Sequence, residues 1–211
     1  MSSQLSTLAE VGFERHDLGD ANTLWTGSLP VNLRLNPAAF DALWRMHPPE
    51  YHEIMMHGRA VRTPRWQQAY GMDYHYTGRV NRALPVPPLL TPLLTWTQRH
   101  INERLNSILL NWYDGTLGHY IGRHRDSTRG MRKDVPIVTV SYGEARVFRL
   151  RPYRGEGRRD FPAHDGSVFV MPYETNLAWT HEVPHARKFS GRRISVTLRG
   201  FLQEGEREPA G

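Results

Sequence analysis

The sequence predicts an α+β domain that is mainly β, an antiparallel sandwich or barrel with helices packed on one face. Three observations indicate this fold class. Strand-like segments separated by Gly, Pro and Asp turns fill the chain from Ser107 onward. Two segments with a helical spacing of apolar residues come before them. The 211 residues suit a single domain, 1–211, with a sizeable core.

The first part of the chain contains a lead-in and one helix. Residues 1–35 are mixed in character, and we expect a loose lead-in with at most a short strand near residues 24–25. The first helix is predicted from Asn36 to about Arg45, because Asn is a favoured N-cap and Pro37 suits the first helical position. Its apolar face consists of residues at helical spacing, Phe40, Leu43 and Trp44.

Residues 51–80 combine polar, aromatic and basic side chains. Tyr74 and Tyr76 are two positions apart, so they share one face of an extended segment. Aromatic rings interleaved with arginines suit stacked bases and phosphates, which makes the segment a candidate for nucleic-acid recognition. The alternative is a hairpin in which the tyrosines pack across neighbouring strands.

A proline-rich connector over residues 82–92 leads to a second helix. The connector is short and apolar, so it is a stiff link and not a domain boundary. The helix is predicted to begin at Thr91 and Pro92 and to end near Leu105. The side chains expected to face the core are Leu93, Leu94, Trp96, Thr97 and Ile101.

Five strands are predicted in the second half of the chain. They lie at residues 107–113, 136–142, 145–151, 166–171 and 193–201. The tail, residues 203–211, is expected to be frayed.

The last strand has one apolar and one polar face, because side chains alternate along a strand. The apolar face consists of Ile194, Val196 and Leu198, and the polar face of Arg193, Ser195, Thr197 and Arg199. Arginines on the inner face of a barrel need an anion, for which a dicarboxylate is a natural candidate. The alternative is that both arginines lie at the rim and pair with acids of the protein. Arg192 has the opposite parity and is expected to point away.

Composition and charge narrow the classes of function. The formal net charge of +6 suits a polyanionic partner, although many proteins are simply basic. The absence of cysteine excludes disulfides, zinc–thiolate sites, iron–sulfur clusters and cysteine nucleophiles. The sequence contains no run of 18 apolar residues, so no membrane span is predicted. The first residues do not have the pattern of a secretory signal. We expect a monomer located in the cytoplasm, or in the nucleus of a eukaryote.

A histidine and a carboxylate that could share a metal ion occur at His124 and Asp126. In an extended segment they project from the same side, although an ordinary surface pair has the same spacing. A third ligand could come from His164, His181 or His185, and spacing alone does not choose among them. Two histidines and one carboxylate form the facial arrangement of non-heme iron(II) oxygenases. Zinc hydrolysis is the main alternative, but it does not explain inward-facing arginines.

Five separated motifs together resemble the AlkB family of Fe(II)/2-oxoglutarate dioxygenases, closest to its DNA-repair branch. They are N-W-Y at residues 111–113, H-R-D at 124–126, a distal histidine, R-x5-R at 193–199 and T-P-R-W-Q-Q-A-Y-G at 63–71. The resemblance covers residues 40–202. It implies a double-stranded β-helix, or jelly-roll, as the catalytic core over residues 107–202, with a nucleotide-recognition lid at residues 51–80.

The same resemblance implies roles for individual residues. Fe(II) would be held by His124, Asp126 and His181, which are then also the catalytic residues. The co-substrate 2-oxoglutarate would contact Asn111, Tyr113, Arg193 and Arg199, with Arg193 on the far carboxylate. Substrate contacts would come from Tyr74, Tyr76, Met56, His57, Ser127 and Thr128. At the last two positions this chain has hydroxyls where repair enzymes often carry acids.

The implied reaction is oxidative dealkylation of an N-alkylated nucleobase in DNA, such as 1-methyladenine or 3-methylcytosine. It uses dioxygen and converts 2-oxoglutarate to succinate and CO2, and the hydroxylated alkyl group leaves as an aldehyde. The base must leave the stack to reach the iron, which is easier for a damaged or single-stranded base. Two alternatives remain: the same chemistry on RNA or protein, and a non-catalytic nucleic-acid-binding barrel.

Overall fold

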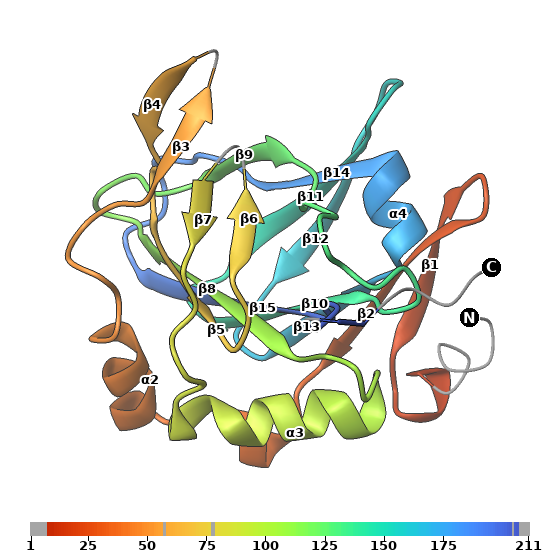
Figure 1. Cartoon of the computed structure of the whole chain (residues 1–211), viewed down its shortest axis with the longest axis horizontal. Helices are drawn as coiled ribbons and strands as arrows, with labels where there is room; N and C mark the ends of the chain where they lie inside the picture. Colours follow the sequence, from red (N-terminus) through yellow and green to blue (C-terminus); the bar gives the residue numbers. More distant parts are fainter. Residues whose placement is uncertain (1–7, 57, 77–78, 204, 207–211) are drawn as a thin grey trace.

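The computed structural model describes residues 8–56, 58–76, 79–203 and 205–206. Two antiparallel sheets pack against each other and form the predicted jelly-roll core (Figure 1). The larger sheet has the strand order β1-β2-β13-β10-β15-β8-β5. Its strands are β1 (Glu14–Gly19), β2 (Asn22–Ser28), β5 (Trp66–Tyr70), β8 (Ser107–Asp114), β10 (Ile137–Gly143), β13 (Ser167–Met171) and β15 (Arg192–Arg199).

The smaller sheet has the order β12-β11-β14-β9. Its strands are β9 (Ile121–His124), β11 (Arg146–Pro152), β12 (Arg159–Ala163) and β14 (Trp179–Val183). Between the two sheets lies an apolar cluster in which Phe148 of β11 stacks on Phe169 of β13, with ring centroids 4.6 Å apart. The smaller sheet therefore covers one face of the larger sheet, and the space between them is where a pocket can form.

Helices cover the other face of the larger sheet, as predicted (Figure 1). They are α2 (Pro37–Trp44) and α3 (Thr91–His100), with the 3-10 turns η1 (Val31–Leu33) and η2 (Pro88–Leu90). Asn36 caps α2, because its side-chain oxygen accepts a hydrogen bond from the backbone N–H of Ala39 at 2.9 Å. Within the sheet, Trp112 donates its indole N–H to the carbonyl oxygen of Leu43, which fixes α2 on the sheet. None of the helices described is long and apolar enough to cross a membrane.

The second helix ends earlier than predicted. The sequence places its end near Leu105, whereas α3 ends at His100. Asn102 is buried and its side-chain oxygen accepts a hydrogen bond from the backbone N–H of Arg104, so the chain turns here. Residues 101–106 then lead directly into β8.

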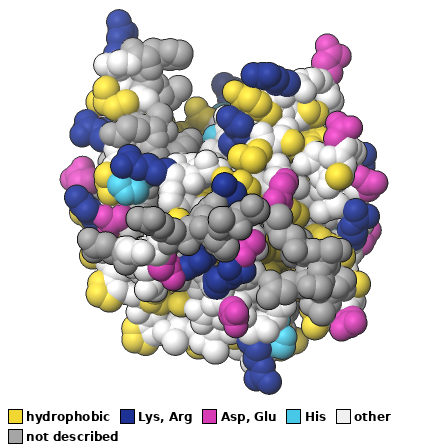
Figure 2. Space-filling view, turned by 45° about the vertical axis from the view of Figure 1, so that its right-hand side comes forward, with side chains coloured by type: hydrophobic (Ala, Val, Ile, Leu, Met, Phe, Trp, Pro, Cys, Tyr) yellow, Lys and Arg dark blue, Asp and Glu magenta, His cyan; other side chains and the backbone are white. Residues whose placement is uncertain are grey.

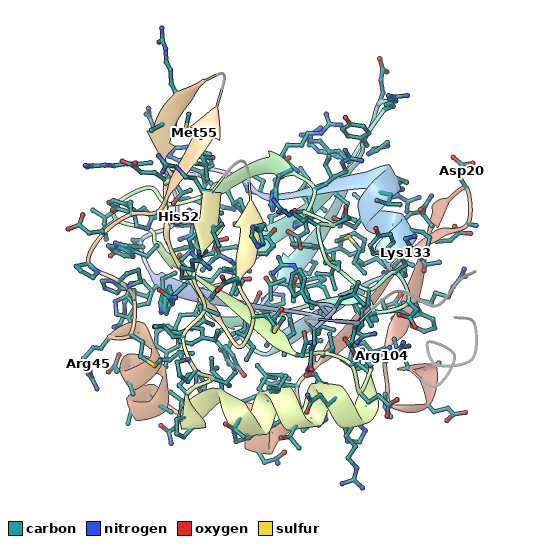
Figure 3. The ribbon with its side chains drawn as sticks, in the orientation of Figure 1. Asp20, Arg45, His52, Met55, Arg104 and Lys133 are labelled. Atoms are coloured by element: carbon teal, nitrogen blue, oxygen red, sulfur yellow. The ribbon has the colours of Figure 1, made fainter. Side chains whose placement is uncertain are left out.

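The prediction of a loose lead-in over residues 1–35 was wrong for the described part. Strands β1 and β2 form a hairpin whose turn is marked by Asp20 in Figure 3, and β2 pairs with β13 at the edge of the larger sheet. Only the strand near residues 24–25 was expected, because β1 is polar and mostly exposed and so lacks the apolar alternation of a core strand.

Residues 51–80 contribute two hairpins and one strand of the core. The hairpins are β3 (Glu53–Met56) with β4 (Arg59–Arg62), and β6 (Tyr74–Tyr76) with β7 (Arg79–Asn81). Between them, β5 joins the larger sheet beside β8. The β3–β4 hairpin, with His52 and Met55 labelled in Figure 3, projects from the same end of the molecule as the β11–β12 hairpin. The assignment of residues 51–80 as a lid stays a prediction. One part of this segment, β5, belongs to the larger sheet of the core.

Candidate metal and co-substrate site

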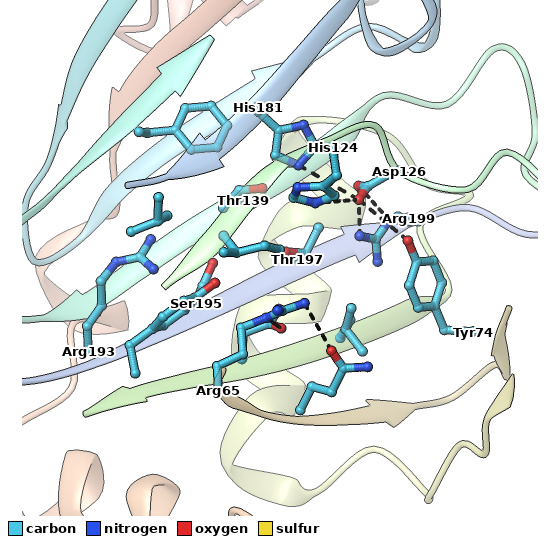
Figure 4. A pocket seen from close by; sticks show the side chains of 17 residues that line it. Arg65, Tyr74, His124, Asp126, Thr139, His181, Arg193, Ser195, Thr197 and Arg199 are labelled. Atoms are coloured by element: carbon cyan, nitrogen blue, oxygen red, sulfur yellow. Dashed lines mark hydrogen bonds and ion pairs between the residues drawn. The ribbon is translucent and has the colours of Figure 1, made fainter. Parts of the chain in front are cut away.

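A pocket lies between the two sheets and is lined by 17 side chains (Figure 4). In the larger sheet, the pocket is lined by the polar face of β15 and part of β8. In the smaller sheet, it is lined by residues of β9 and β14. The alternation predicted for the last strand is confirmed. All four polar-face residues line this pocket, whereas Ile194, Val196 and Leu198 lie in the core under the helices.

Three side chains at one end of the pocket are arranged to hold a metal ion. His124 ends β9 and pairs in register with His181 of β14, and Asp126 follows two residues later. The Oδ1 atom of Asp126 lies 3.7 Å from Nε2 of His124 and 3.8 Å from Nε2 of His181. Two ligand atoms can share a metal ion about 2.1 Å from each at these separations. Among the described residues, these three form the one cluster of that kind.

The protonation states of the histidines also fit a metal ion. Nδ1 of His124 lies 2.9 Å from the carbonyl oxygen of Gly122, so this nitrogen carries the proton and Nε2 keeps its lone pair. Burial and the neighbouring His181 lower the pKa of His124 to about 3. Burial also lowers the pKa of His181. Both rings are therefore neutral near pH 7, and a neutral imidazole is the form that binds a metal.

The carboxylate of Asp126 is held from several sides. Arg199 donates to its Oδ2 from Nε at 3.0 Å and from a terminal nitrogen at 2.7 Å. The hydroxyl of Tyr74 lies 3.5 Å from Oδ1. Burial raises the pKa of Asp126, but Arg199 and the two histidines more than offset this and hold it well below its usual range. The carboxylate is therefore ionised and its Oδ1 faces the histidines.

Asn176 is a supporting residue that the sequence analysis missed. It lies in α4 (Tyr173–Ala178) and is fully buried. Its side-chain oxygen accepts from the backbone N–H of Asp126 at 2.9 Å, and its amide donates to the carbonyl oxygen of the same residue at 3.1 Å. No sequence signal marks this contact, because the two residues are 50 positions apart and Asn176 stands in an ordinary helical turn.

The other end of the pocket carries a buried cation. Arg193 has no exposed surface, and one terminal nitrogen donates to the hydroxyl of Ser141 at 2.8 Å. Its Nε and other terminal nitrogen have no hydrogen-bond partner in the part of the chain that the structure describes. Its guanidinium lies over the ring of Tyr113, 5.0 Å from the centroid. A buried cation of this kind needs an anion, and a carboxylate of 2-oxoglutarate fits that requirement.

The remaining predicted co-substrate residues line the same pocket but have partners of their own. Arg199 lies at the metal end, where it binds Asp126. The side-chain oxygen of Asn111 accepts from Nε of Arg65 at 2.8 Å. Arg65 also donates to Gln67 at 3.1 Å, and both line the pocket. The sequence marks Arg65 only as one of several arginines in residues 51–80. Its irregular position before β5 hides that it points inward.

The histidines that competed with His181 lie elsewhere. His164 and His185 are exposed and neither lines the pocket. His164 precedes the turn into β13, and His185 follows β14. Register with β9, which the sequence does not reveal, selects His181 as the third member of the cluster.

The predicted substrate residues fall into three groups. Tyr74 is buried and lines the pocket. Ser127 and Thr128 line an adjacent open groove instead, together with Arg125 and Arg129. Met56 and Tyr76 belong to β3 and β6 by their backbones, and their side chains lie outside the described part, as does all of His57. The substrate roles of all six stay predictions.

Comparison with known proteins gives a consistent family. The model of the 2OG-Fe(II) oxygenase superfamily matches residues 37–199. The human protein "DNA oxidative demethylase ALKBH2" is 31% identical over 160 residues, which are 71% of this chain and 61% of that protein. The cattle protein "Alpha-ketoglutarate-dependent dioxygenase alkB homolog 3" is 25% identical over 182 residues, 80% of this chain and 63% of that protein.

The matched region spans about three fifths of the length of these relatives. The solved structure of OsALKBH1 has a TM-score of 0.56 to this chain at 10% identity, over 89% of this chain and 100% of that one, and it supports the fold alone. The family match covers the smaller sheet, the larger sheet except β1 and β2, and every residue of the metal cluster. This chain belongs to the 2OG-Fe(II) oxygenase superfamily and, within it, to the AlkB family.

Proposed function

We propose that this protein is an Fe(II)- and 2-oxoglutarate-dependent dioxygenase that oxidatively removes alkyl groups from nucleobases. The observation that carries the proposal is a two-histidine, one-carboxylate cluster in the same pocket as the buried Arg193 guanidinium. A metal end and an anion end in one pocket are what a chelating dicarboxylate requires. The finer proposal is that the substrate is N-alkylated DNA, with bases such as 1-methyladenine and 3-methylcytosine.

Each side chain has a distinct task in this reaction. His124, Asp126 and His181 would hold Fe(II), and Arg193 would bind the far carboxylate of 2-oxoglutarate. Loaded with both and with dioxygen, the site converts 2-oxoglutarate to succinate and CO2 and adds one oxygen atom to the alkyl carbon, which leaves the base as an aldehyde. Arg199 and Asn176 orient the ligand carboxylate from behind.

Two observations support a nucleic-acid substrate. The groove beside the metal cluster is lined by Arg125 and Arg129, which suit phosphates, and the chain carries a net charge of +6. Tyr74 places its ring at the pocket beside Asp126, where an extruded base could contact it. The names of the ALKBH2 relatives describe DNA oxidative demethylases, which favours DNA over RNA or protein for this chain too.

The test is succinate release by the purified chain with Fe(II), 2-oxoglutarate and a panel of substrates. The panel contains oligonucleotides with 1-methyladenine or 3-methylcytosine as DNA and as RNA, their unmodified counterparts, and a methylated peptide. We expect the methylated DNA to stimulate turnover most and the Asp126→Asn variant to show none. Stimulation by RNA or peptide alone would contradict the DNA assignment. Release from none of them would contradict the dioxygenase proposal itself.

A further inference from the structure

An exposed tyrosine stands beside the metal end of the pocket and has no task in the chemistry above. Tyr153 follows β11 at the start of the hairpin loop and is 45% exposed. The guanidinium carbon of Arg125 lies 3.7 Å from the centroid of its ring, and that of Arg154 lies 5.9 Å away. A ring backed by a cation and open to solvent is the arrangement on which proteins stack nucleobases.

Arg125 fixes the position of this ring relative to the metal cluster. It stands between the two ligands His124 and Asp126, which face the pocket, and it points the other way. Its terminal nitrogen donates to the carbonyl oxygen of Leu177 at 2.9 Å, so the guanidinium is held in place while it stacks on Tyr153. The residue between the two metal ligands thus connects the reactive centre to the tyrosine.

The hairpin does not need the Tyr153 side chain to stay in place. Its backbone N–H donates to the carbonyl oxygen of Ala178 at 2.8 Å, and its carbonyl oxygen accepts from Arg123 at 3.2 Å. Arg123 also donates from Nε to the hydroxyl of Thr180 at 2.8 Å. Backbone contacts already tie the hairpin to α4 and β14, so the exposed ring is free for an external partner.

Two open grooves share Leu177, and Arg125 lines one of them while Tyr153 lines the other. One is lined by the metal ligands His124 and Asp126 and the other by Tyr153 and Arg154, and both include Leu177, which is 43% exposed at the end of α4. The contact between Arg125 and Tyr153 therefore connects the two grooves. Figure 2 shows the hollowed end of the molecule with Lys and Arg side chains on both sides of the notch. A flexible strand could therefore run from the metal cluster to Tyr153.

The charge of the hairpin also fits an anionic strand. The acids near its base are paired, Asp160 with Arg149 and Glu182 with Arg151, at distances of 2.6 Å to 2.9 Å. The loop over residues 153–158 contains two arginines and a single acid, Glu156. Arg154 thus places a positive charge next to the ring, which is the combination that single-stranded nucleic acid needs for its phosphates and bases.

We propose that Tyr153, backed by Arg125, is a stacking platform for a base of a single-stranded substrate that flanks the target nucleotide, with Arg154 contacting a neighbouring phosphate. The inference rests on the proposed function, since the strand it binds is the one whose alkylated base enters the pocket. It assigns a nucleotide-binding subsite outside that pocket and favours a single strand, because a base paired in a duplex has both faces stacked.

The first experiment separates stacking from charge. Fluorescence anisotropy would compare the full chain and its variants on a labelled oligothymidylate and on an abasic oligomer of the same length. Tyr153→Ala should weaken binding to oligothymidylate by about 5-fold or more and leave the abasic oligomer unchanged. Tyr153→Phe, which keeps the ring, should bind both as the unaltered chain does. Arg154→Ala should weaken both oligomers, whereas the exposed Arg99→Ala on α3 should weaken neither.

The outcomes that overturn the platform are specific. One is that Tyr153→Ala binds oligothymidylate within about 2-fold of the unaltered chain, a smaller change than the loss of one stacked base would cause. The other is that Tyr153→Ala loses equal affinity for both oligomers. Either result contradicts stacking. The two proposals also fail separately. Absence of turnover on every methylated substrate would contradict the dioxygenase proposal, while the anisotropy measurements would still test whether Tyr153 stacks on a base. Unchanged oligothymidylate binding by Tyr153→Ala, together with normal turnover on methylated substrates, would contradict the stacking platform alone.

A second readout tests where the platform acts. If Tyr153 holds a flanking nucleotide, Tyr153→Ala should raise the KM for a methylated oligonucleotide and leave the KM for a methylated mononucleotide unchanged. Because Tyr153 touches neither the pocket nor the metal cluster, kcat on the mononucleotide should also be unchanged. An equal rise in KM for both substrates would contradict a flanking subsite.

Discussion

Arg199 binds a single oxygen of Asp126, Oδ2, through two hydrogen bonds and leaves Oδ1 facing His124 and His181. The arginine stands at the end of β15 and the aspartate just beyond β9, so the contact joins the two sheets at the metal end. Both side chains are almost completely buried. The pair thus connects the stability of the fold to the geometry of the metal cluster.

Removing Arg199 should lower both the metal affinity of the cluster and the stability of the fold. In Arg199→Ala the buried Asp126 loses its main positive partner, so metal affinity should fall about 10- to 100-fold and the free energy of unfolding should fall by about 3 kcal/mol or more. Titration with Co(II) and urea unfolding measure the two effects. Arg104→Ala, which breaks a partly exposed pair with Asp134, is the control and should cost under about 1 kcal/mol. Unaltered metal affinity in Arg199→Ala would refute the positioning role.

Arg193 and its neighbour Arg192 give a matched test of the anion end. Arg193→Ala should lose most 2-oxoglutarate affinity, because removing one partner of a buried charge pair costs about 2–5 kcal/mol. Arg192 is exposed and pairs with Asp41 at 2.6 Å, so Arg192→Ala should bind 2-oxoglutarate normally. Calorimetric titration of 2-oxoglutarate into the metal-loaded chain measures both. Similar affinities in the two variants would show that the parity of β15 does not select the co-substrate arginine.

Asn176 should act as a positioning residue for the metal ligand. In Asn176→Ala the backbone N–H and carbonyl of Asp126 lose their partners in a buried setting, which costs about 1–3 kcal/mol for each group. We expect weaker Co(II) binding and a lower unfolding midpoint, while Asn32→Ala, at an exposed position, changes neither. A loss of stability without any loss of metal affinity would mean that Asn176 is structural only.

The buried His119 should make the stability of the fold depend on pH. Its Nδ1 accepts from the backbone N–H of Asp114 at 3.1 Å, and its Nε2 lies 3.0 Å from the hydroxyl of Tyr51. Burial lowers the pKa of His119 below its usual 6.5, so the unfolded chain binds a proton that the folded chain does not. Stability is therefore fully present above pH 6.5 and is lost as the pH falls below it, by at most about 1.4 kcal/mol per pH unit for one proton.

Urea unfolding above and well below pH 6.5 measures this effect. His119→Gln, which cannot titrate, should show a smaller loss of stability on acidification than the unaltered chain. His100→Gln removes an exposed histidine at the end of α3 and is the control. An identical pH dependence in His119→Gln and the unaltered chain would contradict a buried neutral His119.

Local sequence patterns predicted the helices and strands that are determined by neighbouring residues in the sequence. The cap at Asn36 and the alternation along β15 depend only on neighbouring residues, so both could be predicted. The hairpin of β1 and β2 was missed because β1 is an exposed edge strand whose partner, not its own pattern, makes it a strand. The early end of α3 was missed because a buried Asn102 turns the chain.

Long-range contacts explain what the site prediction left out. His181 could be chosen over His164 and His185 only through the family resemblance, because its register with His124 is a property of the folded sheet. Asn176 and Arg65 have no sequence pattern that points to the pocket, since each is placed by a turn or bend whose direction depends on packing. The chemistry of the site was therefore predictable, and much of its support was not.

The proposed reaction of this pocket is the removal of an alkyl group from a nucleobase at the expense of 2-oxoglutarate. The most direct measurement is mass spectrometry of a single-stranded 1-methyladenine oligonucleotide after incubation with the chain, Fe(II), 2-oxoglutarate and air, with succinate counted in parallel. We expect the oligonucleotide to lose the mass of one CH2 group for each succinate formed in its presence, and Asp126→Asn to leave it unchanged. An unaltered oligonucleotide beside a chain that binds metal and consumes 2-oxoglutarate would contradict the claim.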